Sequence, residues 1–542
     1  MSKHIVVVLL GIILTAVVAS AIVPVSIRMR GMGEGLVGIV DDEYSDLFFN
    51  PAAINRITGT RVYTNLSNLH NFGSDLIFDP EYSPDMYYNL LGGITTVKHN
   101  KIGALLETGG WDITNTSEEF YNERDGVEMT SDTSKMMMRY KNFNTELDLF
   151  WGKKIDKYYV GAMFGPKLMD GIMEAKYTTI DYYYRHDSML SYTFDETDSV
   201  SKARVMAYPF ILGVISGTHE NENSLSFAFG YDRQNGIIPT NFINSIVTNY
   251  ISTTPWTNEI GFEKMQEKIC QGGFFTSLMG RNKRRYEDHS ISYLAGITYI
   301  HEPISYEAYD TNYSYYTPAT GQIEEDFWID RIKGSGAMNY LALGVGIGAE
   351  KYFSPMGAKS LFAIGFIPSY INGVNKINYK PETYYEHYYH NFPHEGMPDT
   401  LEYTDDWVSG EHYDIKENFG GLSLSLPVGL ETHLTDKLVL RLGASEDMML
   451  TFKYNTDEMM IDSGSTETIH QTLPYDTTWT YHTPDEVSQY HYNYTDKLNF
   501  VNQTTYHYGL GYKINDNIEL NFLNYGQLTD LRNWVLGVNI KF

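Results

Sequence analysis

The sequence has little cysteine, few basic residues and few long apolar runs. Cys270 is the single cysteine among 542 residues, which excludes a disulfide framework and a cysteine-rich metal site. Lys and Arg number 40 against 68 Asp and Glu, giving a formal net charge of −28, so nucleic acid is an unfavourable partner. Because no run of 18 apolar residues follows residue 21, we expect no transmembrane helix in the mature chain.

Aromatic residues are abundant, at 14% of the chain, which argues against intrinsic disorder. The length would suit three or four soluble domains of about 150 residues each. A single large barrel is the alternative, and the strand pattern has to decide between them. The sequence contains no nucleotide-binding loop and no nucleophile motif of the G-x-S-x-G type. We therefore predict no enzyme activity, no cofactor and no metal site.

Residues 1–21 have the pattern of a secretory signal peptide. Lys3 precedes an apolar run from Ile5 to Val18, and Ala19-Ser20-Ala21 supplies the small residues of a cleavage site. A membrane anchor is the alternative, but the run is shorter than the roughly 20 residues that span a bilayer. We expect cleavage after about Ala21 and export from the cytoplasm.

Alternating apolar and polar residues predict many β-strands. The last eleven residues place five apolar side chains on one face: Trp534, Leu536, Val538, Ile540 and Phe542. Such a face packs inward in a soluble sandwich, and it faces lipid in a membrane barrel. The signal peptide and the terminal Phe542 favour a barrel in the bacterial outer membrane, in contact with its lipids.

Fifteen strands follow from this pattern, and a weak sixteenth at 305–313 would restore the even number that such barrels have. If one weak strand is false instead, the number is fourteen. Five long polar stretches are predicted as outer loops: 112–136, 169–203, 234–288, 373–418 and 448–502. We therefore predict an all-β fold, a transmembrane antiparallel up-and-down β-barrel of 14–16 strands formed by residues 60–542.

Residues 22–59 do not alternate and carry three motifs in order. These are a glycine-rich start at Gly31 to Gly35, the paired Asp41-Asp42, and Asn50-Pro51-Ala52. This order resembles the opening of the long-chain fatty acid transporter (FadL) superfamily, which includes aromatic hydrocarbon transporters and the PorV-type barrels of the type IX secretion system. The resemblance implies that residues 22–59 form a plug inside the barrel.

The same resemblance implies passive transport of hydrophobic small molecules such as fatty acids or hydrocarbons. A PorV-like scaffold that docks secreted or secretion-system proteins is one alternative, and a general polar porin is another. In the fatty acid transporters the Asn-Pro-Ala residues lie beside a kink in the third strand that opens the wall. Asn50, Pro51 and Ala52, with Gly109 and Gly110 in the predicted third strand, are therefore the expected gate. A strand that simply ends at Gly109 is the alternative.

The stretch 234–288 has apolar residues at helical spacing. We predict two amphipathic helices there, with an apolar groove for a ligand formed by Phe242, Ile246, Tyr250, Phe262, Met265 and Ile269. Packing of these helices on the barrel rim is the alternative. The basic run Arg281 to Arg285 follows in the same predicted outer loop. It is interpreted as a contact for anionic lipopolysaccharide or a carboxylate ligand, or else as a solvated loop.

Overall fold

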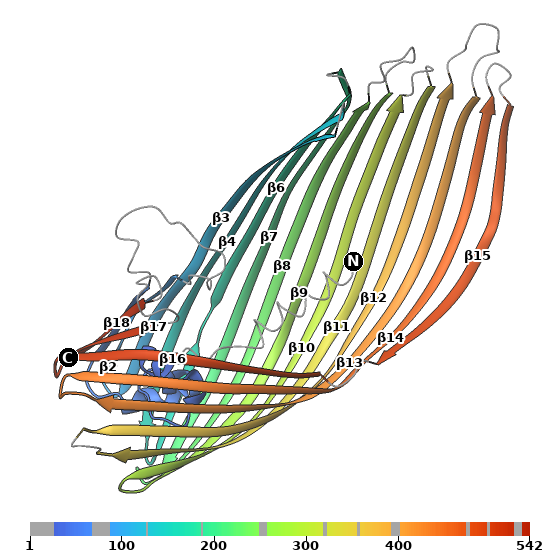
Figure 1. Cartoon of the computed structure of the whole chain (residues 1–542). Helices are drawn as coiled ribbons and strands as arrows, with labels where there is room; N and C mark the ends of the chain where they lie inside the picture. Colours follow the sequence, from blue (N-terminus) through green and yellow to red (C-terminus); the bar gives the residue numbers. More distant parts are fainter. Residues whose placement is uncertain are drawn as a thin grey trace.

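The computed structural model is an all-β closed barrel with four short N-terminal helices (Figure 1). It describes residues 26–67, 87–125, 128–185, 188–248, 257–317, 322–354, 358–391, 401–472, 477–495, 499–524 and 534–542. The helices are α2 (Ile27–Met32), η1 (Glu34–Leu36), α3 (Ser45–Phe49) and η2 (Pro51–Arg56). No helix among the described residues is long and apolar enough to cross a membrane.

The strands follow one another around the ring. They are β1 (Arg61–Ser67), β2 (Tyr87–Val97), β3 (Asn100–Asp125), β4 (Glu128–Ile155), β5 (Tyr158–Phe164), β6 (Lys167–Arg185), β7 (Ser188–Gly217), β8 (Asn221–Thr248), β9 (Thr257–Arg285), β10 (His289–Thr317), β11 (Gln322–Phe353), β12 (Ser360–Asn391), β13 (Leu401–His433), β14 (Leu438–Thr472), β15 (Thr477–Thr495), β16 (Asn499–Asn515), β17 (Ile518–Asn524) and β18 (Trp534–Lys541). All pairings between them are antiparallel, and β1 closes the ring by pairing with β18.

The ring has sixteen strand positions. β5 and β6 pair with the same two neighbours, β4 and β7, because Gly165-Pro166 interrupts a single strand position. β15 and β16 likewise pair one after the other with β14. Sixteen lies within the predicted range, and it confirms the barrel.

The sixteenth strand, which the sequence pattern did not reveal, is β9. The prediction of a separate strand at 305–313 is wrong. Residues 305–313 continue β10, whereas Thr257–Arg285, predicted as part of an outer loop, forms β9. β9 pairs along its length with β8 and β10. Its pattern is hard to see because its outward face mixes Phe274 and Leu278 with polar Thr276, Asn282 and Arg284, so no continuous apolar face marks the strand.

The five stretches predicted as outer loops are also mostly strand. β3, β4 and β6 to β14 have 19 to 35 residues each, far more than the 7 to 11 residues of β1, β2, β17 and β18. The pairing of β11 with β12, for example, continues through Gln322 and Asn391. Strands with two polar faces can pair where both faces meet water, so a search for one apolar face misses them.

A band of outward-facing apolar side chains surrounds the end of the barrel that carries the short turns. On β4, β7, β8 and β12 these exposed residues include Leu147, Leu149, Trp151, Phe210, Leu212, Val214, Leu225, Phe227, Phe229, Phe362, Ile364 and Phe366. They alternate with inward-facing residues, and each of these strands has three outward apolar residues in succession, as in the apolar band of a membrane barrel. Figure 1 shows the long strands rising well beyond this end.

Candidate functional site

The N-terminal segment, residues 26–57, folds through its own polar caps. The Ser26 hydroxyl accepts a hydrogen bond from Met29 N at 3.1 Å, and Asp42 Oδ1 accepts one from Ser45 N at 2.8 Å. Asn50 caps η2, with Pro51 at the first position of the helix. These caps satisfy free N–H groups at helix starts, as Ser, Asp and Asn commonly do.

The ring encloses this segment. Met29, Met32, Leu36, Ile39 and Leu47 are fully buried. The segment touches strands all around the barrel: α2 packs on β13, β14, β16 and β17, η1 on β12 and β13, and η2 on β3, β4, β5 and β7. It is not a member of the ring of strands. It lies against the inward-facing side of the wall, at the level of the apolar band outside.

Glycines in the wall allow this close approach. An added Cβ at Gly213 would lie 1.9 Å from Asn50 Oδ1, and one at Gly161 would lie 2.4 Å from the Pro51 carbonyl carbon. At Gly443 the nearest atom is the Met32 carbonyl carbon, at 2.3 Å. The same contact with the segment recurs at Gly152, Gly348, Gly365, Gly429, Gly509 and Gly537. A wall with side chains at these positions would have no room for the segment.

Asn50 holds the segment to β7 and β8. Its side-chain amide donates to Ser224 Oγ at 2.7 Å, Leu225 O at 3.1 Å and Val214 O at 3.2 Å. Its Oδ1 accepts from Ala52 N at 3.0 Å, and Asn50 is only 1% exposed. The motif Asn50-Pro51-Ala52 therefore acts here as a buried anchor of the segment.

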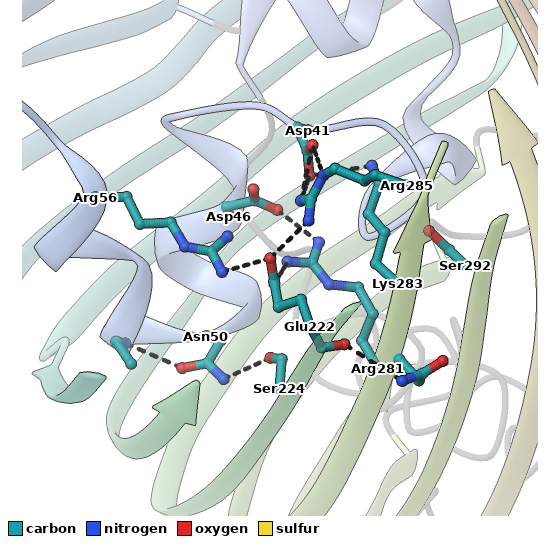
Figure 2. A network of polar contacts seen from close by, with 12 residues as sticks. Asp41, Asp46, Asn50, Arg56, Glu222, Ser224, Arg281, Lys283, Arg285 and Ser292 are labelled. Atoms are coloured by element: carbon teal, nitrogen blue, oxygen red, sulfur yellow. Dashed lines mark hydrogen bonds and ion pairs between the residues drawn. The ribbon is translucent and has the colours of Figure 1, made fainter. Parts of the chain in front are cut away.

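A cluster of buried ion pairs joins the segment to β8 and β9 (Figure 2). Arg281 binds Asp46 at 3.2 Å and Glu222 at 2.9 Å. Glu222 also binds Arg56 at 2.5 Å and Arg285 at 3.1 Å. Glu222 thus connects two arginines of the wall with one of the segment.

Lys283 is the most deeply buried member of the cluster, with no exposed side-chain surface. Its Nζ donates to Ile39 O at 2.7 Å and contacts Glu350 at 2.7 Å and Asp41 at 3.0 Å. Arg285 binds Asp41 at 3.0 Å. All three hydrogens of the ammonium group therefore have acceptors, as a buried lysine requires.

Two further polar contacts hold the opposite side of the segment. Arg28 forms a two-pronged pair with Glu431, at 2.9 and 3.1 Å, and lies 3.5 Å from Asp42. Arg61 of β1 binds Glu43 at 2.8 Å. The segment is therefore held by charges from β1, from β8 and β9, and from β13.

The electrostatics of the two aspartates differ. Burial raises the pKa of Asp46 to about 6, with Asp41 and Asp42 nearby, although Arg281 opposes the shift. Burial acts in the same direction on Asp41, but Lys283 and Arg285 outweigh it and hold the pKa of Asp41 below its usual value. Asp41 is accordingly the ionised partner of the wall, whereas Asp46 titrates near neutral pH.

The interpretation of the basic run as an outer-loop contact is wrong. Arg281, Lys283 and Arg285 alternate along β9 and point inward at the end with the short turns, where they bind the segment. Arg284 between them is exposed. The run stood out in the sequence, and so did the Asp41-Asp42 pair, but only the folded ring brings the two together.

The gate predicted at Gly109 and Gly110 is not found. β3 passes through both glycines in unbroken register with β2 and β4. Gly110 is the last residue of β3 that pairs with β2 among the described residues. Asn50 and Pro51 contact β5, β7 and β8, so they do not lie at a kink of the third strand.

The helices predicted in the 234–288 stretch are also wrong. Phe242 and Ile246 belong to β8, and Phe262, Met265 and Ile269 belong to β9; Tyr250 lies outside the described residues. A spacing of four residues places side chains on one face of a helix and also on one face of a strand. That ambiguity explains the error, and it removes the predicted groove.

The described residues contain no group of three or more His, Cys, Asp and Glu side chains arranged to hold a metal ion. No protein-family model matches the chain, and no curated protein matches it significantly in sequence.

Solved outer-membrane transporters align with the chain at low scores. The toluene transporter TodX of Pseudomonas putida is 9% identical over 82% of this chain and 97% of its own, with a TM-score of 0.21. The siderophore receptor PiuA of Acinetobacter baumannii is 7% identical over 90% and 82%, with a TM-score of 0.25. The ferric-catecholate receptor Fiu of E. coli, in its open form, is 8% identical over the same shares, with a TM-score of 0.23. These likenesses carry no argument about substrate, so the strand pairing alone establishes the barrel.

Proposed function

We propose that this chain is an outer-membrane barrel for passive transport of small molecules, and that its N-terminal segment is a plug. One observation carries the proposal: a segment enclosed by the ring is bound by charges and close glycine contacts at the level of the outer apolar band. A buried lysine and several arginines devoted to one internal segment are costly unless they are paired. Their pairing supports a plug that stays in place.

The proposal divides the chain into three parts. Residues 1–21 are a signal peptide, residues 22–59 the plug and residues 60–542 the barrel; residues 1–25 lie outside the described part of the chain. The outward apolar band supports insertion into a bilayer. The chemistry is binding and passage, with no covalent step.

Planar-bilayer conductance tests the plug. The unmodified barrel should show a small, steady conductance. The double variant Asp41→Ala, Arg285→Ala removes ion pairs between the segment and the wall and should open larger and fluctuating channels. Arg284→Ala, an exposed neighbour on β9, is the matched control and should leave conductance unchanged. Equal conductance in all three proteins would contradict the plug.

Hydrophobic cargo is a second candidate, favoured by an apolar cluster between the segment and β1 to β5. Tyr44, Phe48 and Ile54 meet Leu105, Phe150 and other apolar side chains there, and the rings of Phe48 and Phe150 pack edge to face at 5.4 Å. The expected ligand site is this cluster, because residues 242–269, for which helices with an apolar groove were predicted, belong largely to strands β8 and β9. Phe150→Ala should weaken binding of a fluorescent fatty acid if the candidate is right, and unchanged binding would remove it.

Docking of secreted or secretion-system proteins is a third candidate, favoured by the height of the wall. β11 to β14 have 32 to 35 residues, about three times what the apolar band needs. The surface beyond the band includes exposed Phe120, Tyr121, Tyr309 and Trp328. Co-purification of the full chain with an exported protein would support this role, and a barrel that purifies alone under the same conditions would oppose it.

A further inference from the structure

A cavity of about 360 Å³ lies between part of the segment and one side of the wall. The segment contributes Ser26 to Arg28 and Asp42 to Tyr44, and the wall contributes residues of β1, β2, β16, β17 and β18. The ion cluster of Figure 2 joins the segment to β8 and β9 instead. The segment is therefore held most strongly on the side of β8 and β9. On the cavity side it is bordered by open space as well as by the packing of α2 on β16 and β17 and the pair of Arg61 with Glu43.

The cavity runs alongside the segment and along the inward face of β1. Three inward residues of β1 line it: Arg61, Tyr63 and Asn65. They span about 14 Å at roughly 3.4 Å per strand residue. The cavity also reaches Asn515 to Asn517, at the turn between β16 and β17. It thus extends from the level of Asn65 to the end of the barrel with the short turns.

Its lining is polar and balanced in charge. Asn65, Asn521 and Asn539 present side-chain amides, which both donate and accept hydrogen bonds. Four cationic and four anionic side chains also line it: Arg28, Arg61, Lys513, Lys541, Asp42, Glu43, Asp516 and Glu519. Among these, Arg61 pairs with Glu43 at 2.8 Å, and Arg28 lies 3.5 Å from Asp42. A lining of equal opposite charges selects neither cations nor anions, and it disfavours apolar solutes.

We propose that small neutral or zwitterionic solutes rich in hydrogen-bonding groups cross the barrel through this cavity while the segment stays in place. This inference rests on the proposed transport function and names its substrate class and route. A volume of 360 Å³ is near the lower end for ligand pockets and holds about a dozen waters at roughly 30 Å³ each. It suits solutes of the size of a monosaccharide or an amino acid.

Swelling of proteoliposomes that contain the full-length barrel tests the route. Glucose and glycine should enter, and the trisaccharide raffinose should enter at least fivefold more slowly. Asn65→Trp would fill the cavity and should slow glucose entry at least fivefold. Asn539→Trp, on the paired strand β18, is a second filling variant. Thr64→Trp places the same side chain on the outward face of β1 and should leave entry unchanged.

Each result has a distinct meaning. If both filling variants fold, as circular dichroism shows, and glucose still enters at the normal rate, the route is wrong. If glucose entry is slow in the unmodified barrel but fast in Asp41→Ala, Arg285→Ala, then displacement of the plug, and not the cavity, provides the path. If no solute enters through any of these proteins, the proposed transport function itself is wrong.

Discussion

At the scale of single residues, the sequence marks the charged groups of the site but not their partners. Asp41-Asp42 and the basic run at 281–285 both stand out by composition. The two groups are about 240 residues apart in the chain, and they meet only because of the position of β9 in the ring. The alternation along β9 was available as a signal, because Arg281, Lys283 and Arg285 share one face of a strand.

Replacing Lys283 with Met should destabilise the barrel strongly. The change leaves Glu350 and Asp41 with one fewer cation, and breaking a buried ion pair costs about 3–5 kcal/mol. Urea unfolding in detergent measures this cost. Lys283→Met with Glu350→Leu should recover much of the loss, and Arg284→Met should be neutral. A stability of Lys283→Met equal to that of the unmodified barrel would show that the cluster is solvated.

Asp46 should make stability depend on pH. Its pKa is raised from 3.8 to about 6 in the folded barrel, so the folded state binds the proton more tightly than the unfolded chain does. The stabilising contribution is complete below about pH 4 and is lost as pH rises through about 6. Each tenfold difference in proton affinity between the two states is worth about 1.4 kcal/mol. The thermal midpoint should therefore fall from pH 4 to pH 7, and less so in Asp46→Asn. An identical fall in both proteins would assign the effect to other groups.

At the scale of elements, strands with one apolar face were predictable and strands with two polar faces were not. The short turns at Asp156-Lys157 and at Thr435-Asp436 were placed correctly, because turn residues carry local information. The upper halves of β12 and β13 and the whole of β9 lack that pattern. The contacts of residues 26–57 with the wall were also not predictable, since a glycine in a strand does not indicate which segment will pack against it.

The glycines of the wall should be specific to the segment. In Gly213→Val the new side chain would collide with Asn50 and Pro51, and overpacking of this kind costs about 1–3 kcal/mol. We expect a lower unfolding midpoint and faster proteolysis of residues 26–57. Gly171→Val is the matched control, because its nearest neighbour would be Ala203 O at 3.9 Å. Equal effects of the two substitutions would mean that strand propensity, rather than the segment, explains the loss.

At the scale of the whole molecule, the barrel is asymmetric along its axis and around its ring. Short turns, the apolar band and the enclosed N-terminal segment share one end, and strands of up to 35 residues rise from it. Around the ring, β17, β18, β1 and β2 line the proposed passage, whereas β8 and β9 carry the buried ion pairs. The negative charge that excluded nucleic acid lies partly on the long polar strands, such as Asp326 and Glu325 of β11.

This asymmetry predicts the orientation of the barrel in the membrane. The long strand ends carry too many charged and polar groups to cross a bilayer, so they should stay outside the cell, with the short turns in the periplasm. An epitope inserted between Thr317 and Gln322, which connect β10 to β11, should bind antibody on intact cells. The same epitope at Asp436, in the turn between β13 and β14, should bind only after the outer membrane is permeabilised. The reverse pattern would place the plug at the cell surface, and it would require the passage to be entered from the short-turn end.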